Sequence, residues 1–395
     1  MVDRHSCPAC GESEMEVFYK LNSVPTNSVV LLSSFQEAVD YPRGDIKLSF
    51  CPQCGFISNV SYDQKLTEYS SKYEPTQGFS QTFNEFHRNL ADRLIKRYDL
   101  HNKKIIEIGC GKGEFLNLLC SMGHNKGVGF DPAYEEGRLD TNNTQDIQFI
   151  KDFYSEKYAN YHGDFLCCKM TLEHIYEANE FISMVRTSLG DTNETMVFFQ
   201  VPEALRILRD CAFEDIYYEH CSYFTPGSLG RLFRRCGFEI LNIKTEYDNQ
   251  YITIESKPKG NTNSQLLPSE EELETLRDYV VSFPQRCQEK FKWWKNKLQE
   301  LKINSIKTVL WGSGSKGVSF LTSLNVGEQI EYVVDINPYR QGHFMSGTGQ
   351  KIVSPEFLKA CKPGVIIVMN SVYCNEIKQI LSQMDLFPEL IPLYR

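Results

Sequence analysis

The sequence predicts an α/β fold in three parts: a small β-rich module, a central Rossmann-like domain and a second, C-terminal Rossmann-like α/β domain. Strand-like apolar segments alternate with helix-like segments over residues 76–257, and the same pattern restarts after residue 305. Such alternation is typical of parallel, doubly wound sheets. Short apolar runs separated by Pro, Gly, Asn and Ser predict the β-rich module at the N-terminus. We expect the three parts to span residues 1–62, 63–257 and 258–395.

The bulk properties of the chain narrow its class. A length of 395 residues favours several domains, since single cores rarely grow beyond about 250 residues. The net charge of -9 argues against nonspecific binding to nucleic acid or to anionic membranes. The sequence has no apolar run long enough for a transmembrane helix and no signal-peptide segment at its start. Fourteen cysteines, mostly single within apolar segments, favour a reduced, cytoplasmic protein.

The central domain is expected to begin with a helix at Phe79–Tyr98, whose apolar residues fall on one side. A buried strand at Lys104–Ile108 and a helix at Glu114–Met122 follow, with a glycine turn between them. Further buried strands are predicted at Gly127–Phe130, Phe165–Lys169 and Thr195–Val201.

The C-terminal part is expected to start with a linker at Lys257–Glu270, which is rich in Pro, Gly, Asn and Ser. A long charged helix at Glu271–Leu301 follows. We expect Pro284 to interrupt this helix, because proline removes a backbone N–H. Buried strands are then predicted at Thr308–Trp311, Tyr332–Val334 and Val365–Met369.

The turn after the first central strand, from Glu107 to Phe115, has the features of a cofactor site. Gly109, Gly111 and Gly113 follow the strand at once and precede a helix. Glycines there let the backbone approach a ligand at the helix N-terminus. The carboxylate of Glu107 suits the ammonium group of methionine better than a phosphate. The spacing is that of the first motif of class I methyltransferases and predicts binding of S-adenosylmethionine (SAM).

Three later positions support a SAM site. Asp131 ends the next strand, where an acidic residue typically accepts the ribose hydroxyls. Asp152 lies where this fold usually contacts adenine, and Lys169 ends the strand after it. A glycine motif alone is weak evidence for a SAM site, because it could also be a tight turn in an unrelated Rossmann-like domain. Several features in the right order favour the SAM site.

Two CxxC motifs in the N-terminal module predict a metal site. Their spacing and the glycine after each motif suit a tetrahedral site with four thiolates, which would make the zinc structural. Two disulfides and a redox CxxC are the alternatives; neither fits a reduced protein in which no CxxC opens a helix. The predicted ligands are Cys7, Cys10, Cys51 and Cys54.

Two Glu-His pairs are candidates for acid–base chemistry. Glu219 and His220 lie between tyrosines in the loop after the strand that ends at Val201, and Glu173 and His174 follow the strand at Phe165–Lys169. A histidine beside a carboxylate can act as a general base. Because such loops line the ligand crevice of a doubly wound sheet, both pairs can face one cavity. Each histidine could instead be an ordinary surface or core residue.

The order of these parts resembles the three-domain C-methyltransferases that modify nucleotide-linked 4-keto-deoxysugars. The resemblance covers nearly the whole chain. It is carried by the CxxC pair, the SAM turn and the Tyr-x-Glu-His-x-Ser-Tyr-Phe segment at 217–224. The C-terminal domain adds a glycine turn at 311–317 and an Asp-x-Asn-Pro-x-Arg-Gln-Gly stretch at 335–342.

The resemblance implies a mechanism and a set of roles. His220 would remove the proton on C3 of the sugar, Glu219 would orient His220, and the enolate would attack the SAM methyl group. Tyr217 and His174 would hydrogen-bond the keto oxygen, and Tyr73 would also serve catalysis. The substrate, a small molecule and a nucleotide sugar, would be held by Tyr69, Tyr223, Gly314, Lys316, Asp335, Asn337 and Arg340.

Read from the residues alone, the second glycine turn looks like a dinucleotide fingerprint with Asp335 as the ribose acid. The resemblance implies a Rossmann-like domain without a redox cofactor, so NAD binding is not expected. Two departures from the family pattern, the wider spacing of Tyr69 and Tyr73 and a serine at Ser346 before Gly347, leave the acceptor open. The competing hypotheses are an O- or N-methyltransferase acting on another anionic metabolite and a non-enzymatic binding protein.

Overall fold

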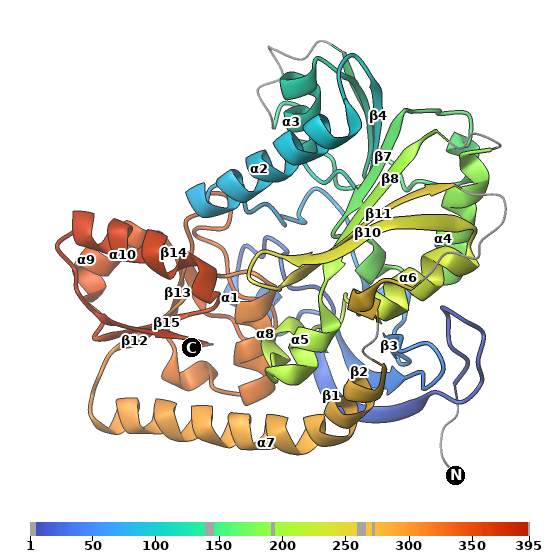
Figure 1. Cartoon of the computed structure of the whole chain (residues 1–395). Coiled ribbons are helices and arrows are strands. Elements are labelled where there is room, and N and C mark those ends of the chain that lie inside the picture. Colours follow the sequence, from blue (N-terminus) through green and yellow to red (C-terminus); the bar gives the residue numbers. More distant parts are fainter. Residues whose placement is uncertain (1–4, 139–145, 191–193, 259–265, 271–272, 394–395) are drawn as a thin grey trace.

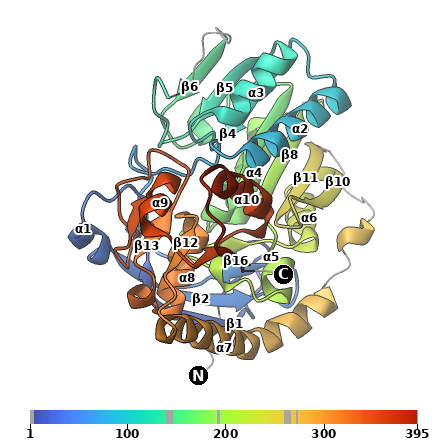
Figure 2. The same ribbon diagram turned by 90° about the vertical axis from the view of Figure 1, so that its left-hand side faces the viewer.

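The computed structural model describes residues 5–138, 146–190, 194–258, 266–270 and 273–393. Three β-sheets form the frame of the molecule (Figures 1 and 2). Residues 259–265 of the predicted linker, and Glu271 at the expected start of the long helix, lie outside the described residues. None of the described helices has the length and apolarity needed to cross a membrane.

The first sheet is built mainly from the N-terminal residues. Its antiparallel strands are β1 (Glu16–Pro25), β2 (Arg43–Phe50) and β3 (Ile57–Asn59), with the short helix α1 (Phe35–Val39) between β1 and β2. The fourth strand, β9 (Ser222–Tyr223), comes from the Tyr-x-Glu-His segment and pairs with β3. The sequence did not predict this strand, because its partner lies more than 160 residues earlier. The pairing ties the predicted catalytic loop to the N-terminal module.

The central sheet has the strand order β10-β11-β8-β7-β4-β5-β6. Strands β4, β5, β6, β7 and β8 are parallel, and the reversed strand β11 pairs antiparallel with β8 and β10. The doubly wound fold is therefore confirmed, and the sheet has three strands, β6, β10 and β11, that the sequence did not predict. The strands are β4 (Lys104–Ile108), β5 (Lys126–Phe130), β6 (Ile147–Ile150), β7 (Phe165–Lys169), β8 (Met196–Pro202), β10 (Phe238–Glu246) and β11 (Tyr251–Pro258).

Helices cover both faces of the central sheet (Figure 1). On one face, α2 (Gln81–Tyr98) and α3 (Glu114–Gly123) pack their apolar residues against β4, β7 and β8 in one buried cluster. On the other face, α4 (Ala178–Ser188) and α6 (Pro226–Arg235) form a second cluster with the same strands. The parallel strands thus end at a common edge, where loops can form a ligand site.

The helix α7 (Leu273–Ile303) contains Pro284 within one continuous helix, so the expected interruption is wrong. Proline within a helix costs about 3 kcal/mol, but neighbouring packing can hold the helix together. Phe283 is fully buried and meets the rings of Phe18 and Tyr19 edge-on, at 6.1 and 5.1 Å between centroids. The helix runs beneath the molecule, from the N-terminal module to the C-terminal domain (Figure 1).

The third sheet is parallel, with the order β14-β13-β12-β15-β16. Its strands are β12 (Thr308–Trp311), β13 (Tyr332–Val334), β14 (Lys351–Val353), β15 (Val365–Val368) and β16 (Glu389–Pro392). The remaining α-helices are α5 (Ala204–Arg209), α8 (Ser315–Leu324), α9 (Leu358–Cys361) and α10 (Cys374–Gln383). The three strands predicted for this domain are confirmed, and the glycine turn leads from β12 into α8 as expected.

Candidate active site

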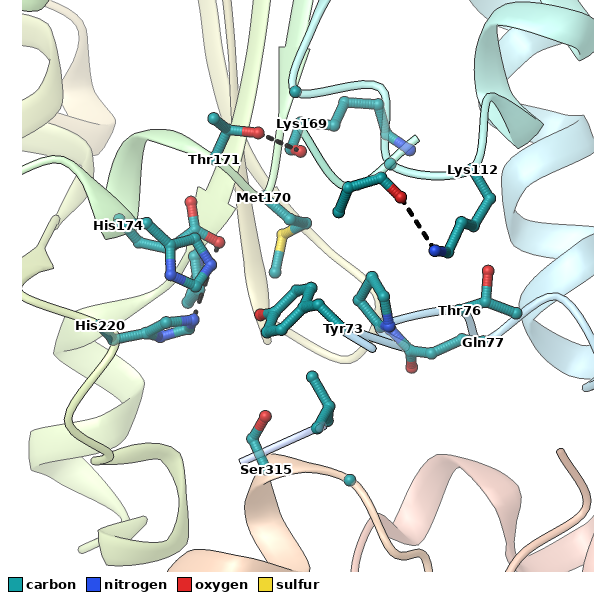
Figure 3. A pocket seen from close by; sticks show the side chains of 18 of the residues that line it. Tyr73, Thr76, Gln77, Lys112, Lys169, Met170, Thr171, His174, His220 and Ser315 are labelled. Carbon is teal, nitrogen blue, oxygen red and sulfur yellow. Dashed lines mark hydrogen bonds and ion pairs between the residues drawn. The ribbon is translucent and has the colours of Figure 1, made fainter. Parts of the chain in front are cut away.

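A cavity of about 630 Å³ lies at the carboxyl ends of β4, β5 and β7, and the C-terminal domain forms part of its wall. Its wall includes the first glycine turn, the segment 69–80, the loop around His220 and the turn that starts α8. Figure 3 shows Lys169 and Thr171 at the top, His174 and His220 at the left, and Ser315 at the bottom. Both glycine turns and both Glu-His segments therefore face one space.

The first glycine turn has the geometry of a cofactor cradle. Gly109, Gly111 and Gly113 all have positive φ, at 69°, 55° and 86°. A Cβ on Gly109 would lie 1.9 Å from Thr171 Oγ1, whereas a Cβ on Gly111 would meet nothing within 4 Å. The first glycine thus permits close packing against the next strand's loop, and the second leaves open space beside the turn.

Glu107, at the end of β4, offers an unused acceptor to this cradle. The residue is 2% exposed, and its Oε2 has no hydrogen-bond partner among the described residues. Burial raises its pKa, and the nearby Lys169 opposes that rise. Lys169 Nζ lies 2.9 Å from His87 Nε2 and 3.9 Å from the centroid of the Phe115 ring. An orphaned buried carboxylate oxygen fits the ammonium group of SAM.

The two predicted nucleoside contacts differ in their surroundings. Asp131 accepts hydrogen bonds from Gly111 N–H at 2.8 Å and Ala133 N–H at 2.7 Å, so the turn fixes its carboxylate at the cavity. Asp152 also lines the cavity, but its carboxylate is engaged by Lys157 and by Tyr158 Oη at 2.7 Å. The geometry thus favours Asp131 as the ribose acceptor and leaves Asp152 as part of the rim.

His174 and His220 meet at the far end of the cavity, with ring centroids 4.7 Å apart. His174 Nδ1 lies 2.9 Å from the carbonyl oxygen of Glu219 and 2.9 Å from Tyr69 Oη. Because a carbonyl only accepts, Nδ1 carries the proton of the neutral ring. Burial lowers the His174 pKa to about 4, so the ring is neutral and its Nε2 cannot donate. The expected donation from His174 to a keto oxygen does not fit this geometry.

Phenols supply the donors that His174 does not. Tyr73 and Tyr217 line the cavity, and burial raises both pKa values well above the ordinary value, which keeps the hydroxyls protonated. Figure 3 shows Tyr73 pointing toward His220. Tyr69 and Tyr73 pack edge-on with centroids 5.2 Å apart, so their wide spacing in the sequence still brings both phenols to one wall.

Glu219 does not orient His220, which corrects the expectation from the sequence. Its carboxylate accepts hydrogen bonds from Asn27 Nδ2 at 2.9 Å and from the Ser28 backbone and hydroxyl. Tyr218 and Glu219 are the central residues of a turn in which the His220 N–H donates to the Tyr217 carbonyl at 3.2 Å. This turn directs Glu219 to the N-terminal module and His220 to the cavity. The carboxylate near His220 belongs to Glu173, whose Oε1 lies 4.0 Å from His220 Nε2.

Tyr223 does not reach the substrate cavity either. It lies on β9, is 4% exposed and packs in a buried cluster with residues of the N-terminal module, including Tyr19. It was expected to bind substrate because it belongs to the family motif. Strand pairing with Ile57 turns it into the core of the first sheet instead.

The substrate residues predicted in the C-terminal domain line the cavity, but three of them have structural partners. Asp335 accepts from Ser313 N–H at 2.9 Å and from Arg340 Nη1 at 3.3 Å. Asn337 donates to Glu74 Oε1 at 3.1 Å, and Arg340 donates to the Glu74 carbonyl. These side chains hold the segment at 74–76 against the C-terminal domain, so any contact with substrate is a second role.

Gly314 and Lys316 lie at the start of α8 and also line the cavity. Lys316 forms an ion pair with Asp215, which also pairs with Arg206. Burial would raise the Asp215 pKa, but Lys316 and Arg206 hold it well below its ordinary value. Two cations thus surround one carboxylate beside the α8 N-terminus. No local pattern predicted Arg206 or Asp215, because these residues and Lys316 meet only in the folded chain.

The four predicted metal ligands converge in the N-terminal module. All four sulfurs lie within 4.8 Å of one another, with Cys7–Cys54 at 3.7 Å and Cys10–Cys51 at 3.6 Å. Zn–S bonds of about 2.3 Å in a tetrahedron require sulfurs about 3.8 Å apart. A disulfide requires about 2.05 Å. The set could therefore hold a metal ion and fits zinc.

Two protein families match parts of this chain. The family described as a methyltransferase domain matches residues 81–243, and the family described as a C-methyltransferase C-terminal domain matches residues 250–386. The C-methyltransferase NovU of Streptomyces niveus is 24% identical over 306 residues, which are 73% of this chain and 72% of NovU.

Two solved structures are also similar. N,N-8-amino-8-demethyl-D-riboflavin dimethyltransferase (RosA) of Streptomyces davawensis has 18% identity and a TM-score of 0.37, covering 45% of this chain and 56% of RosA. Magnesium protoporphyrin IX methyltransferase (ChlM) of Synechocystis PCC 6803, with bound SAH, has 15% identity and a TM-score of 0.36, covering 45% of this chain and 84% of ChlM.

The cradle and the methyltransferase match together define the class: the protein is a SAM-dependent methyltransferase. Its C-terminal part matches a second domain, which is described as the C-terminal domain of C-methyltransferases. Together, the two domain matches and the C-methyltransferase NovU support the C-methyltransferase family that the motifs of this chain resemble.

Proposed function

We propose that this C-methyltransferase methylates C3 of a nucleotide-linked 4-keto-deoxysugar. The C4 ketone acidifies the hydrogen on C3, His220 accepts that proton, and the enolate carbon forms the new bond to the methyl group. The observation that carries the proposal is that His220 and Tyr73 line the same cavity as the first glycine turn. SAM, when bound, supplies an electrophilic methyl group.

The protonation state of His220 suits a general base. Its side chain is buried, and burial together with the nearby His174 lowers its pKa well below the ordinary value. The imidazole is therefore unprotonated at neutral pH and has a lone pair for the substrate proton. Tyr73 and Tyr217 are assigned as donors to the keto oxygen, where negative charge develops.

The cofactor is assigned to the cradle residues. Glu107 would accept from the SAM ammonium group and Asp131 from the ribose hydroxyls, while Gly109, Gly111 and Gly113 allow the backbone to come close. Lys169 and Phe115 would line the methionine end, and Asp152 the adenine end. Alignment of the methyl group with the acceptor carbon by these contacts is itself a large part of such catalysis.

We assign the methyl acceptor a negatively charged nucleotide group. Lys316 and Arg206 surround Asp215 beside the N-terminus of α8, and Gly314 leaves that turn open to the cavity. Backbone N–H groups at a helix start together with nearby cations favour phosphate groups. The rest of the substrate would extend along Tyr69 toward His220.

The function is tested by product structure. Purified protein, SAM and a panel of nucleotide-linked 4-keto-deoxysugars should give a product with a new methyl group on C3 by NMR. In D₂O, the enzyme should also exchange the C3 hydrogen. His220→Asn should lower turnover by about 10²- to 10⁴-fold, the usual contribution of a general base. The exposed His101→Asn is the matched control and should keep full turnover.

An O- or N-methylated product from this panel would favour the alternative acceptor class, since His220 could also deprotonate a hydroxyl or an amine. Full turnover by His220→Asn, with SAM affinity unchanged, would contradict the base assignment. No product from any sugar in the panel would contradict the proposed substrate.

We also infer that Cys7, Cys10, Cys51 and Cys54 hold a structural zinc ion. The cluster offers no open position, so the metal would stabilise the module that packs against the catalytic loop through β9. Elemental analysis should give one zinc per chain, and Cys51→Ser should lose it together with thermal stability. Cys361→Ser, a buried cysteine in the C-terminal domain, is the matched control and should keep the zinc.

A further inference from the structure

Glu173 has a buried carboxyl group beside the catalytic cavity, and the proposed reaction does not yet use it. It lies in the 3-10 turn Leu172–His174, directly after β7. The residue is 1% exposed, and neither side-chain oxygen has a hydrogen-bond partner among the described residues. Burying such a group without a partner costs free energy, and such groups cluster at functional sites.

The imidazole of His220 lies within ion-pair distance of this carboxyl, with Oε1 and Nε2 4.0 Å apart. The other titratable groups around it are uncharged at neutral pH: His174 on the same turn, the Cys168 thiol on β7, Cys221 and Tyr217 on the loop, and Tyr73 and Tyr251 across the cavity. The charged pair Lys316 and Asp215 acts on His220. Among the described residues, His220 is the one basic side chain within ion-pair distance of Glu173.

We propose that Glu173, and not Glu219, is the positioning residue that orients His220 and balances its charge when it takes the substrate proton. The proposal rests on the proposed function. As a carboxylate, Glu173 accepts the Nε2–H of His220, which leaves the lone pair on Nδ1. The C3 proton moves to Nδ1, the electron pair of the C–H bond becomes the enolate and then the new C–C bond, and His220 is left as an imidazolium.

Charge conservation in a closed cavity supports this role. The reaction removes the positive charge of the sulfonium and creates one on His220, so the site carries one positive charge before and after. A single fixed carboxylate can offset both. A buried imidazolium without a partner would be strongly disfavoured, as the low pKa of His220 indicates.

The proposal sets the direction of the pH dependence. Burial raises the pKa of Glu173 to about 8. In the cofactor-free enzyme, the carboxylate that orients His220 therefore forms as the pH rises through about 8. A base that depended on His220 alone would already be active below pH 6.5. Exchange of the C3 hydrogen without SAM should thus increase through about pH 8.

Glu173→Gln keeps the shape and removes the charge. We expect at least a 100-fold loss of kcat with KM for the acceptor within threefold of wild type, and loss of the step near pH 8 from the exchange profile. In NMR of protein labelled at histidine, the His220 ring, assigned by comparison with His220→Asn, should show a shift near pH 8 in the wild type and none in Glu173→Gln. This NMR readout needs neither SAM nor an acceptor.

Two further variants keep the test decisive. Glu219→Gln, which changes the neighbouring carboxylate, should keep the His220 step near pH 8. In Glu173→Asp, the NMR signal of His220 should still change with pH, but at a different pH from wild type. This variant replaces Glu173→Gln if the latter does not fold. A His220 titration that is the same in wild type and in both Glu173 variants would overturn the proposal. If the panel of sugars fails but the His220 step depends on Glu173, the substrate assignment fails and the pairing stands.

Discussion

The two glycine turns of this protein begin alike and end in different uses. In each, a buried parallel strand leads into a glycine turn and a helix, and an acidic residue from the next strand accepts a backbone N–H of the turn. Gly111 N–H donates to Asp131 at 2.8 Å, and Ser313 N–H donates to Asp335 at 2.9 Å. The local geometry thus repeats within one chain.

The difference lies in what else reaches the acid. Asp335 also accepts from the Ser313 hydroxyl and pairs with Arg340, which in turn holds the Glu74 carbonyl. Besides the bond from Gly111, the Asp131 carboxylate accepts one from the Ala133 N–H at 2.7 Å. Nearby, Glu107 leaves one carboxylate oxygen without a partner among the described residues. One turn keeps free acceptors for a ligand, whereas the other uses its acid to join two domains. A glycine fingerprint therefore predicts a turn, not its ligand.

Substituting the glycines gives the largest expected contrast between the turns. Gly109→Ala combines a positive φ with a Cβ 1.9 Å from Thr171 Oγ1, so we expect SAM binding to be lost and the melting temperature to fall. Gly317→Ala places a Cβ 2.4 Å from the Gly312 carbonyl and should also destabilise the protein, by about 1–3 kcal/mol. SAM affinity measured by calorimetry on the folded fraction should remain within twofold for Gly317→Ala. Equal loss of SAM binding in both variants would contradict the distinction.

Changing the two acids should separate binding from stability. Asp131→Asn removes a charged acceptor of the ribose hydroxyls, worth about 1.5–3 kcal/mol, and should raise the SAM Kd by about 10- to 150-fold. Asp335→Asn should leave that Kd within twofold but lower the free energy of unfolding by about 1–3 kcal/mol, because Arg340 loses its anionic partner. Calorimetry and urea unfolding of both variants check this. A larger effect of Asp335→Asn on SAM affinity would show that the turns are coupled.

The smallest expected effect is the response to a dinucleotide. Because Asp335 is occupied by Ser313 and Arg340, NADH should not bind to the second turn, and its fluorescence should not change on titration with up to millimolar protein. Arg340→Ala is a stricter test, since it removes the cation beside Asp335 while the Ser313 N–H and hydroxyl still occupy the same oxygen. Saturable NADH binding by the wild type would contradict the structural use of this turn.

Several elements of the fold follow from the sequence because their residues are buried on both sides. The predicted ranges Lys104–Ile108, Phe165–Lys169, Thr308–Trp311 and Tyr332–Val334 match strands β4, β7, β12 and β13 residue for residue. Such continuous apolar runs bounded by turns are typical of parallel strands. Strands β10 and β11, at one end of the central sheet, were missed, because they carry polar residues among apolar ones and form no such continuous run.

The sequence could not supply contacts between distant segments. Strand β9 is two residues long and exists because Tyr223 pairs with Ile57. Helix α7 continues through Pro284 because Phe283 packs against the N-terminal module. In both cases tertiary packing outweighs the local preference of the chain.

By itself, the sequence determined the class of the protein: the glycine turn with Glu107 and Asp131, the two CxxC motifs and the histidines are local patterns, and local patterns fix residue types and spacing. Only the tertiary structure decided which partner each side chain meets. It turned Glu219 to Ser28, buried Tyr223 and brought Glu173 to His220, because the direction of a side chain on a loop depends on the strands to which that loop is attached.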